Sequence, residues 1–167
     1  ILNTGANSRH DIDFVAAILD TLTENYCVDE DRIFSTGYSL GSMFNYELAC
    51  QMNAQFAATA SFAGTMPIAP ESCDIDDPMS ILHIHGTADE IIPYDSEWDW
   101  KSWDSVGRMH SVPGLVDAWR ERYSCTDMNE TNGSATSYVA HTGCDGDATV
   151  AHYRLEGQNH GWPNTID

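Results

Sequence analysis

The run Gly-Tyr-Ser-Leu-Gly at residues 37–41 constrains the fold more than any other part of the chain. It follows an apolar segment that predicts a short buried strand, residues 32–36, and it precedes a helical stretch, residues 43–52. A serine on so sharp a strand-to-helix turn needs glycines at the flanking positions, because side chains there would clash. The pattern predicts a nucleophile elbow that projects the Ser39 hydroxyl from the sheet edge. The alternative is an ordinary glycine turn.

The rest of the chain alternates strand and helix patterns. An amphipathic helix is expected over residues 11–25, and a second helix begins after Ser111, a good N-cap, and runs to about residue 123. Strands are expected at 57–63, 80–85 and 149–155. One face of the first helix carries the apolar residues Phe14, Val15, Ile18, Leu19 and Leu22. This alternation predicts an α/β fold with a parallel sheet, and the length suits one domain.

A serine nucleophile needs a base and an acid, and in a strand–turn–helix elbow of this kind the chain order is serine, acid, histidine. Asp89 lies just beyond the strand that ends at His85, at the carboxyl end of a sheet strand, where ligand chemistry gathers. Asp95 is a rival for the acid. A third choice, the cluster Asp74, Asp76 and Asp77, fits a solvated charge run better.

Among the histidines, His160 is the candidate base, because it lies in the loop after the last expected strand, over residues 157–162. His152 lies within that strand and has a structural role, and His141 lies in a separate polar segment. His83 and His85 share one strand face. They could form a metal pair, but the sequence offers no further ligand cluster, so we expect them to support the Asp89 loop and we predict no metal site.

Acyl transfer also needs N–H donors for the oxyanion. The backbone N–H of Leu40 is the first candidate, and the second should come from a loop after an earlier strand, which is not found before Ser39. Tyr38 in the elbow and Trp162 beside His160 are candidates for binding substrate. The tryptophans at positions 98, 100 and 103 could form a substrate wall or could pack their segment onto the domain.

Five cysteines indicate an oxidising compartment. Cys125 pairs plausibly with Cys144, closing a polar segment with little else to hold it, and Cys50 with Cys73. The fifth, Cys27, is expected to be free and buried, or to pair outside this chain. Five reduced thiols are the alternative.

The formal net charge is −19, from 26 acidic and 7 basic residues. Such a surface repels nucleic acid and anionic membranes, so neither is expected as a partner. A neutral ester, including a polymeric one, meets no such barrier. No run of eighteen apolar residues occurs, so nothing here is expected to span a membrane.

Linked motifs in order resemble the polyhydroxybutyrate depolymerase-like and feruloyl esterase-like branch of the α/β-hydrolases. The motifs that carry the resemblance are 25–29 (Asn-Tyr-Cys-Val-Asp), the elbow, 83–89 (His-Ile-His-Gly-Thr-Ala-Asp), 92–94 (Ile-Pro-Tyr) and 159–163 (Asn-His-Gly-Trp-Pro). The resemblance implies that Ser39, Asp89 and His160 form the triad. It also implies extracellular hydrolysis of polyesters or of acyl groups on plant polysaccharides, without a cofactor.

Two residues depart from that pattern: Leu40 stands where Asn or Gln is frequent, and Gly161 where Thr is common. The family's opening strands would precede Ile1, so residues 1–167 are expected to be a partial α/β-hydrolase catalytic domain. A further N-terminal segment or a partner would complete its sheet. The alternatives are a catalytically silent carbohydrate-binding module on the hydrolase scaffold, and a hydrolase of peptides or lactones.

Overall fold

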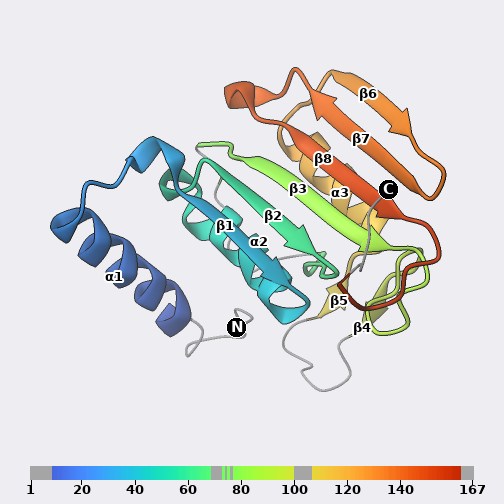
Figure 1. Cartoon of the computed structure of the whole chain (residues 1–167), viewed down its shortest axis with the longest axis horizontal. Helices are drawn as coiled ribbons and strands as arrows, with labels where there is room; N and C mark the ends of the chain where they lie inside the picture. The colour runs from blue at the N-terminus through green and yellow to red at the C-terminus, as the bar shows by residue number, and fades with distance from the viewer. Residues whose placement is uncertain (1–8, 69–72, 74, 76, 100–106, 163–167) are drawn as a thin grey trace.

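Six strands of the computed structural model form one mostly parallel sheet, in the order β1-β2-β3-β8-β7-β6 (Figure 1). The structure describes residues 9–68, 73, 75, 77–99 and 107–162. Strands β1, β2, β3 and β8 are parallel, whereas β7 and β6 extend the sheet in antiparallel fashion. The predicted α/β-hydrolase type of fold, a parallel sheet with flanking helices, is confirmed.

The helices are α1 (Arg9–Asn25), α2 (Leu40–Gln51) and α3 (Val112–Arg122), with short 3-10 turns at Glu30–Arg32, Asn53–Gln55 and Asp145–Asp147. The sheet strands are β1 (Phe34–Tyr38), β2 (Ala58–Phe62), β3 (Ser80–Gly86), β6 (Asp127–Asn132), β7 (Thr136–Thr142) and β8 (Val150–Leu155). A separate two-stranded sheet pairs β4 (Trp98–Asp99) with β5 (Arg108–Met109).

Helices α2 and α3 cover one face of the sheet, α2 against β1 and β2 and α3 against β8 (Figure 1). The main core lies between these helices and the sheet and includes Tyr46, Ile81, Leu115 and Trp119, all nearly inaccessible. Alternation along β3 turns Ile81 and the two histidines of that strand toward this buried face. Polar side chains therefore lie in the core directly behind the carboxyl end of β3.

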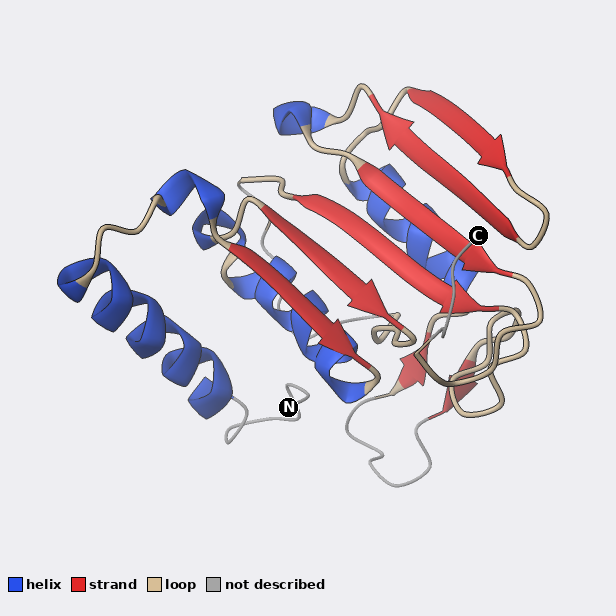
Figure 2. Ribbon diagram, in the orientation of Figure 1, coloured by secondary structure: helices blue, strands red, loops and turns tan. Residues whose placement is uncertain are grey.

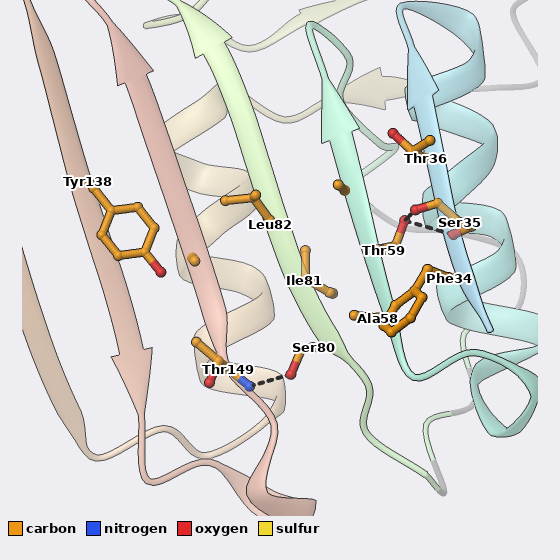
Figure 3. Close-up of a pocket in the computed structure, with 12 residues that line it drawn as sticks. Phe34, Ser35, Thr36, Ala58, Thr59, Ser80, Ile81, Leu82, Tyr138 and Thr149 are labelled. Carbon is orange, nitrogen blue, oxygen red and sulfur yellow. Dashed lines mark hydrogen bonds between the residues drawn. The ribbon is translucent and has the colours of Figure 1, made fainter. Parts of the chain in front are cut away.

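The described residues cover the other face of the sheet only in part. A shallow hollow of about 460 Å³ lies on it, away from α2 and α3, and is lined by residues of β1, β2, β3, β7 and β8 (Figure 3). Its lining is mostly apolar and includes Phe34, Leu82 and Tyr138. Ser35 and Thr149 donate hydrogen bonds there to Thr59 and Ser80.

One expectation about burial was wrong. The first predicted strand, β1, alternates exposed and half-buried residues instead of being buried, because among the described residues only β2 pairs with it. In α1, which lies beyond β1 in Figure 1, Phe14, Ile18 and Leu22 are exposed. Two other residues of the predicted apolar face, Val15 and Leu19, pack against the core, which also contains Ile12 of α1.

The segment between Cys125 and Cys144 is a strand pair, not an unsupported polar loop. Strands β6 and β7 form an antiparallel hairpin, and β7 continues onto β8. Disulfides join Cys125 to Cys144 and Cys50 to Cys73, the two expected pairs, while Cys27 is free and exposed instead of buried. Two disulfides suit an oxidising compartment.

Among the described residues, no helix combines the length and the apolar character that crossing a bilayer requires. All four parallel strands end at the same edge of the sheet, and the loops that follow them gather there (Figure 2). This edge holds the residues singled out by the sequence.

Candidate active site

Ser39 stands in a strained backbone conformation between β1 and α2, with φ 55° and ψ −116°. Few residues other than glycine adopt a positive φ, and such strain gathers at functional sites. Backbone hydrogen bonds hold the turn: the Ser39 N–H donates to the Phe62 carbonyl at 2.9 Å, and the Ser39 carbonyl accepts from the Met43 N–H at 3.1 Å. Although Ser39 is the N-cap of α2, its hydroxyl makes no capping bond, so it is available for another partner.

The two flanking glycines are not equivalent. A Cβ at Gly37 would lie 2.2 Å from the Gly41 carbonyl oxygen, so only glycine fits there without a backbone shift. A Cβ at Gly41 would meet no described atom within 4 Å. The expectation that both glycines relieve a clash therefore holds for Gly37 and is wrong for Gly41.

Ser39, His160 and Asp89, which lie far apart in the sequence, form one hydrogen-bonded row. The Ser39 Oγ lies 3.0 Å from His160 Nε2, and His160 Nδ1 lies 2.7 Å from Asp89 Oδ2. Since a carboxylate only accepts, His160 carries its proton on Nδ1 and presents the Nε2 lone pair to the serine hydroxyl. This arrangement can remove a proton from Ser39.

The Asp89 carboxylate is buried and held at both oxygens. Oδ1 accepts the backbone N–H groups of Ile91 at 2.9 Å and Ile92 at 2.8 Å, while Oδ2 faces His160 and, at 3.2 Å, His85 Nε2. Burial acts to raise the pKa of this carboxyl, but the hydrogen bonds from His85, the two backbone N–H groups and His160 outweigh it. The pKa falls from 3.8 to about 2, so Asp89 is ionised at neutral pH.

Close backbone packing seats the His160 loop against the Asp89 loop. A Cβ at Gly86, the last residue of β3, would lie 2.1 Å from the Gln158 carbonyl oxygen, so glycine is required for the approach. The Ala88 N–H donates to that carbonyl at 3.0 Å. The Tyr38 hydroxyl donates to the His160 carbonyl at 3.3 Å, which ties the loop to β1.

An aromatic group borders the triad on the side of His160. Trp162 packs on Phe62 with ring centroids 4.6 Å apart and on Tyr38 at 5.7 Å, yet it is 67% exposed. Tyr38 also lies 5.2 Å from the His160 ring. The two predicted substrate-binding residues thus stand side by side, and an exposed indole face is available to a ring of a ligand.

Of the three tryptophans between residues 98 and 103, only one lies among the described residues. Trp98 packs against a small cluster that contains Met43, Ile92 and Met109, so it holds its segment onto the domain. Trp100 and Trp103, the other members of the expected substrate wall, lie outside the described residues.

Leu40 is the first residue of α2, so its N–H has no acceptor within the helix and points out of the helix N-terminus. It follows the nucleophile directly, as an oxyanion donor must. A developing negative charge at this end of α2 is also favoured by the helix dipole.

The rival residues do not join the row. Asp95 is exposed, as is Asp77, whereas Asp74 and Asp76 lie outside the described residues. His152 is buried in β8 near Tyr94, and burial, followed by the charges of His85, Arg154 and His141, lowers its pKa to about 4. Within the described ranges, no three His, Cys, Asp or Glu side chains are grouped to hold a metal ion.

Sequence reasoning missed Tyr46. Its hydroxyl lies 2.6 Å from His83 Nδ1 in the core, and His83 Nε2 lies 3.0 Å from His85 Nδ1. A tyrosine in the middle of a helix gives no local sign that its hydroxyl meets a histidine on a strand. The supporting role expected for His85 matches its contact with Asp89 and its hydrogen bond to the Ile92 carbonyl at 3.0 Å.

Residues 3–105 match the dienelactone hydrolase family. The chain is 27% identical, over 165 residues, to the bifunctional acetylxylan esterase/xylanase XynS20E of Neocallimastix patriciarum, covering 94% of this chain and 22% of that protein. It is 28% identical to the putative esterase NocK of Nocardia uniformis subsp. tsuyamanensis, covering 92% of this chain and 48% of that protein. It is 37% identical over 97 residues to feruloyl esterase C of Emericella nidulans, covering 56% of this chain and 35% of that protein. The chain thus spans half or less of the length of these relatives.

Proposed function

Since the chain belongs to the dienelactone hydrolase family of α/β-hydrolases, we propose that it hydrolyses carboxylic esters through an acyl-enzyme formed on Ser39. The observation that carries the proposal is the hydrogen-bonded row from Ser39 through His160 to Asp89. Similarity to proteins named as feruloyl and acetylxylan esterases supports an esterase.

In the first step, His160 Nε2 takes the hydroxyl proton as Ser39 Oγ bonds to the ester carbonyl carbon. The carbonyl oxygen becomes an oxyanion that the Leu40 N–H stabilises. The carbon–oxygen bond to the alcohol then breaks, and His160 gives its proton to the leaving oxygen.

Water completes the cycle. His160 takes one proton from it as the water oxygen attacks the acyl carbon, and the acid leaves as Ser39 regains its proton. Throughout, Asp89 accepts the Nδ1–H of His160 and stabilises the imidazolium.

The proposed substrates are uncharged esters in which an acyl group is attached to a plant polysaccharide. The exposed Trp162 beside His160 offers a stacking face for an aromatic acyl group or a sugar ring. The net charge of −19 disfavours anionic substrates. The two disulfides support action outside the cell.

Hydrolysis of p-nitrophenyl acetate and methyl ferulate by the complete protein tests the proposal. Ser39→Ala should lose on the order of ten-thousandfold or more in kcat. The matched control is Ser35→Ala, since Ser35 lies on the same strand and bonds Thr59 instead of His160. Equal rates for Ser39→Ala and the unchanged protein would overturn the assignment.

The substrate class is tested separately with Trp162→Ala. If Trp162 binds the acyl group or sugar, KM for methyl ferulate should rise about tenfold while KM for p-nitrophenyl acetate changes little. The exposed Trp162 also fits the second candidate, a carbohydrate-binding module without activity. Binding of xylan without turnover, with no labelling of Ser39 by a fluorophosphonate, would favour that candidate.

A further inference from the structure

A row of buried polar side chains continues from Asp89 into the core, away from Ser39. His85 Nε2 lies 3.2 Å from Asp89 Oδ2, His83 Nε2 lies 3.0 Å from His85 Nδ1, and the Tyr46 hydroxyl lies 2.6 Å from His83 Nδ1. Tyr46 and His83 are 1% exposed and His85 is inaccessible. Burying three polar side chains in series costs free energy unless each hydrogen bond is made.

The protons of this row can be assigned from its acceptors. His85 Nε2 faces only acceptors, the Ile92 carbonyl at 3.0 Å and the Asp89 carboxylate, so Nε2 carries a proton. In neutral His85, Nδ1 is then an acceptor, so His83 must donate from Nε2. His83 Nδ1 is in turn an acceptor and receives the hydroxyl proton of Tyr46. All three donors thus point toward Asp89.

We propose that Tyr46, His83 and His85 are positioning residues of the site, and that their aligned donors determine how strongly Asp89 accepts the proton of His160. The inference rests on the proposed esterase function. Hydrogen bonds in a chain polarise one another in the same direction, so the end of the chain that meets Asp89 is the strongest donor. Asp89 Oδ2 shares its negative charge between His85 and His160, which limits how far it stabilises the His160 imidazolium.

The surroundings keep His83 of this row neutral. Burial, followed by the charges of His85 and His152, holds the pKa of His83 well below 6.5. The neighbouring side chains are His152 of β8, whose ring lies 5.9 Å from His83, and Tyr94, whose ring lies 6.0 Å from His85. The titratable or charged groups that act on His152 and Tyr94 are Arg154, His141, Asp95 and Glu156. On the other side of Asp89, Tyr38 of β1 faces the His160 ring. His83 and His152 are therefore neutral at pH 7.

The test compares His85→Leu with His85→Gln in the complete protein, by measuring kcat and KM for p-nitrophenyl acetate across pH. Without the His85 donor, Asp89 accepts more strongly from His160. The imidazolium is then better stabilised, and the acid limb of kcat/KM should move up by about half a pH unit or more. Because Asp89 also loses one of the contacts that fix its carboxylate beside His160, we expect kcat to fall about tenfold to a hundredfold and KM to stay unchanged. Gln, which donates from a similar position, should restore both the limb and kcat.

Tyr46→Phe provides a second variant that removes one oxygen atom. It should move the acid limb in the same direction by a smaller amount, because Tyr46 acts through two histidines. The control is Tyr123→Phe, a tyrosine equally buried at the end of α3, which should leave the limb unmoved. A folded His85→Leu or Tyr46→Phe protein with the acid limb of the unchanged protein overturns the proposal.

Nitrogen NMR of the imidazoles gives an independent readout. The proposal expects His85 and His83 each to carry one proton, on Nε2, at pH 7. A doubly protonated His85 would reverse the donors of His83 and Tyr46 and overturn it. The outcomes separate the two proposals: an active Ser39→Ala defeats the esterase function. An inactive Ser39→Ala with an unmoved limb in His85→Leu defeats only the positioning role.

Discussion

Replacing the Asp89 carboxylate by an amide, Asp89→Asn, tests the site because each carboxylate oxygen has different partners. Oδ1 accepts two backbone N–H groups, at 2.9 and 2.8 Å, so the amide oxygen is expected to stay there. The NH2 group then occupies the Oδ2 position, 2.7 Å from His160 Nδ1 and 3.2 Å from His85 Nε2. His160 must accept at Nδ1 and carry its proton on Nε2, where it can no longer take the proton of Ser39.

The magnitude follows from the two orientations of the amide. The unproductive orientation loses the general base, which costs about ten-thousandfold in kcat. The reverse orientation restores the acceptor for His160 but sets NH2 against both backbone donors. It leaves the two backbone N–H groups without an acceptor, which costs about 1–3 kcal/mol each. The productive orientation is therefore populated about one part in thirty or less, and kcat should fall between about thirtyfold and ten-thousandfold.

The assay is kcat for p-nitrophenyl acetate at pH 7, with circular dichroism to establish that the fold is intact. The control is Asp95→Asn, which makes the same chemical change at the exposed rival and should leave kcat within about twofold. A folded Asp89→Asn protein that loses less than tenfold would refute the assignment of Asp89 as the partner of His160.

Four further outcomes are expected. The Asp89 carboxyl, with its pKa lowered from 3.8 to about 2, adds about 2 kcal/mol to the free energy of unfolding above pH 4, and this contribution is lost as the pH falls toward 2. The acid unfolding of Asp89→Asn should lack this pH-dependent loss. His152, with its pKa lowered from 6.5 to about 4, stays neutral in the fold while the unfolded chain takes up the proton. Stability should fall by about 3 kcal/mol between pH 6.5 and 4, and by less in His152→Gln, as denaturant titrations at both pH values would show. Gly37→Ala should cost about 1–3 kcal/mol and most of the activity, whereas Gly41→Ala should be neutral or slightly stabilising in thermal melts. Replacing Cys125 and Cys144 together by serine should lower the free energy of unfolding by about 3 kcal/mol, with little effect on kcat; an unchanged melting temperature would contradict this.

The elements that could be predicted from sequence are those with local signals. Local sequence patterns located β2, β3, β8 and α3 within a few residues, and Ser111 caps α3 as expected, accepting the Gly114 N–H at 3.2 Å. The hairpin of β6 and β7 was missed because β6 is exposed throughout and carries no apolar alternation. Its strands are held by pairing with each other and with β8, and that pairing leaves no trace in the composition of the segment.

By itself, the sequence determined the elbow and the order of serine, acid and histidine along the chain, because a tight turn and the ends of strands depend on neighbouring residues. The tertiary structure alone decided that, among the described residues, β1 pairs on one side only and Gly41 has no close contacts, and that Tyr46 reaches His83. These properties depend on which distant segments pack together, and burial and hydrogen bonding between such segments are set only when the sheet and its helices assemble. The same assembly brings Asp89 and His160, 71 residues apart, to 2.7 Å.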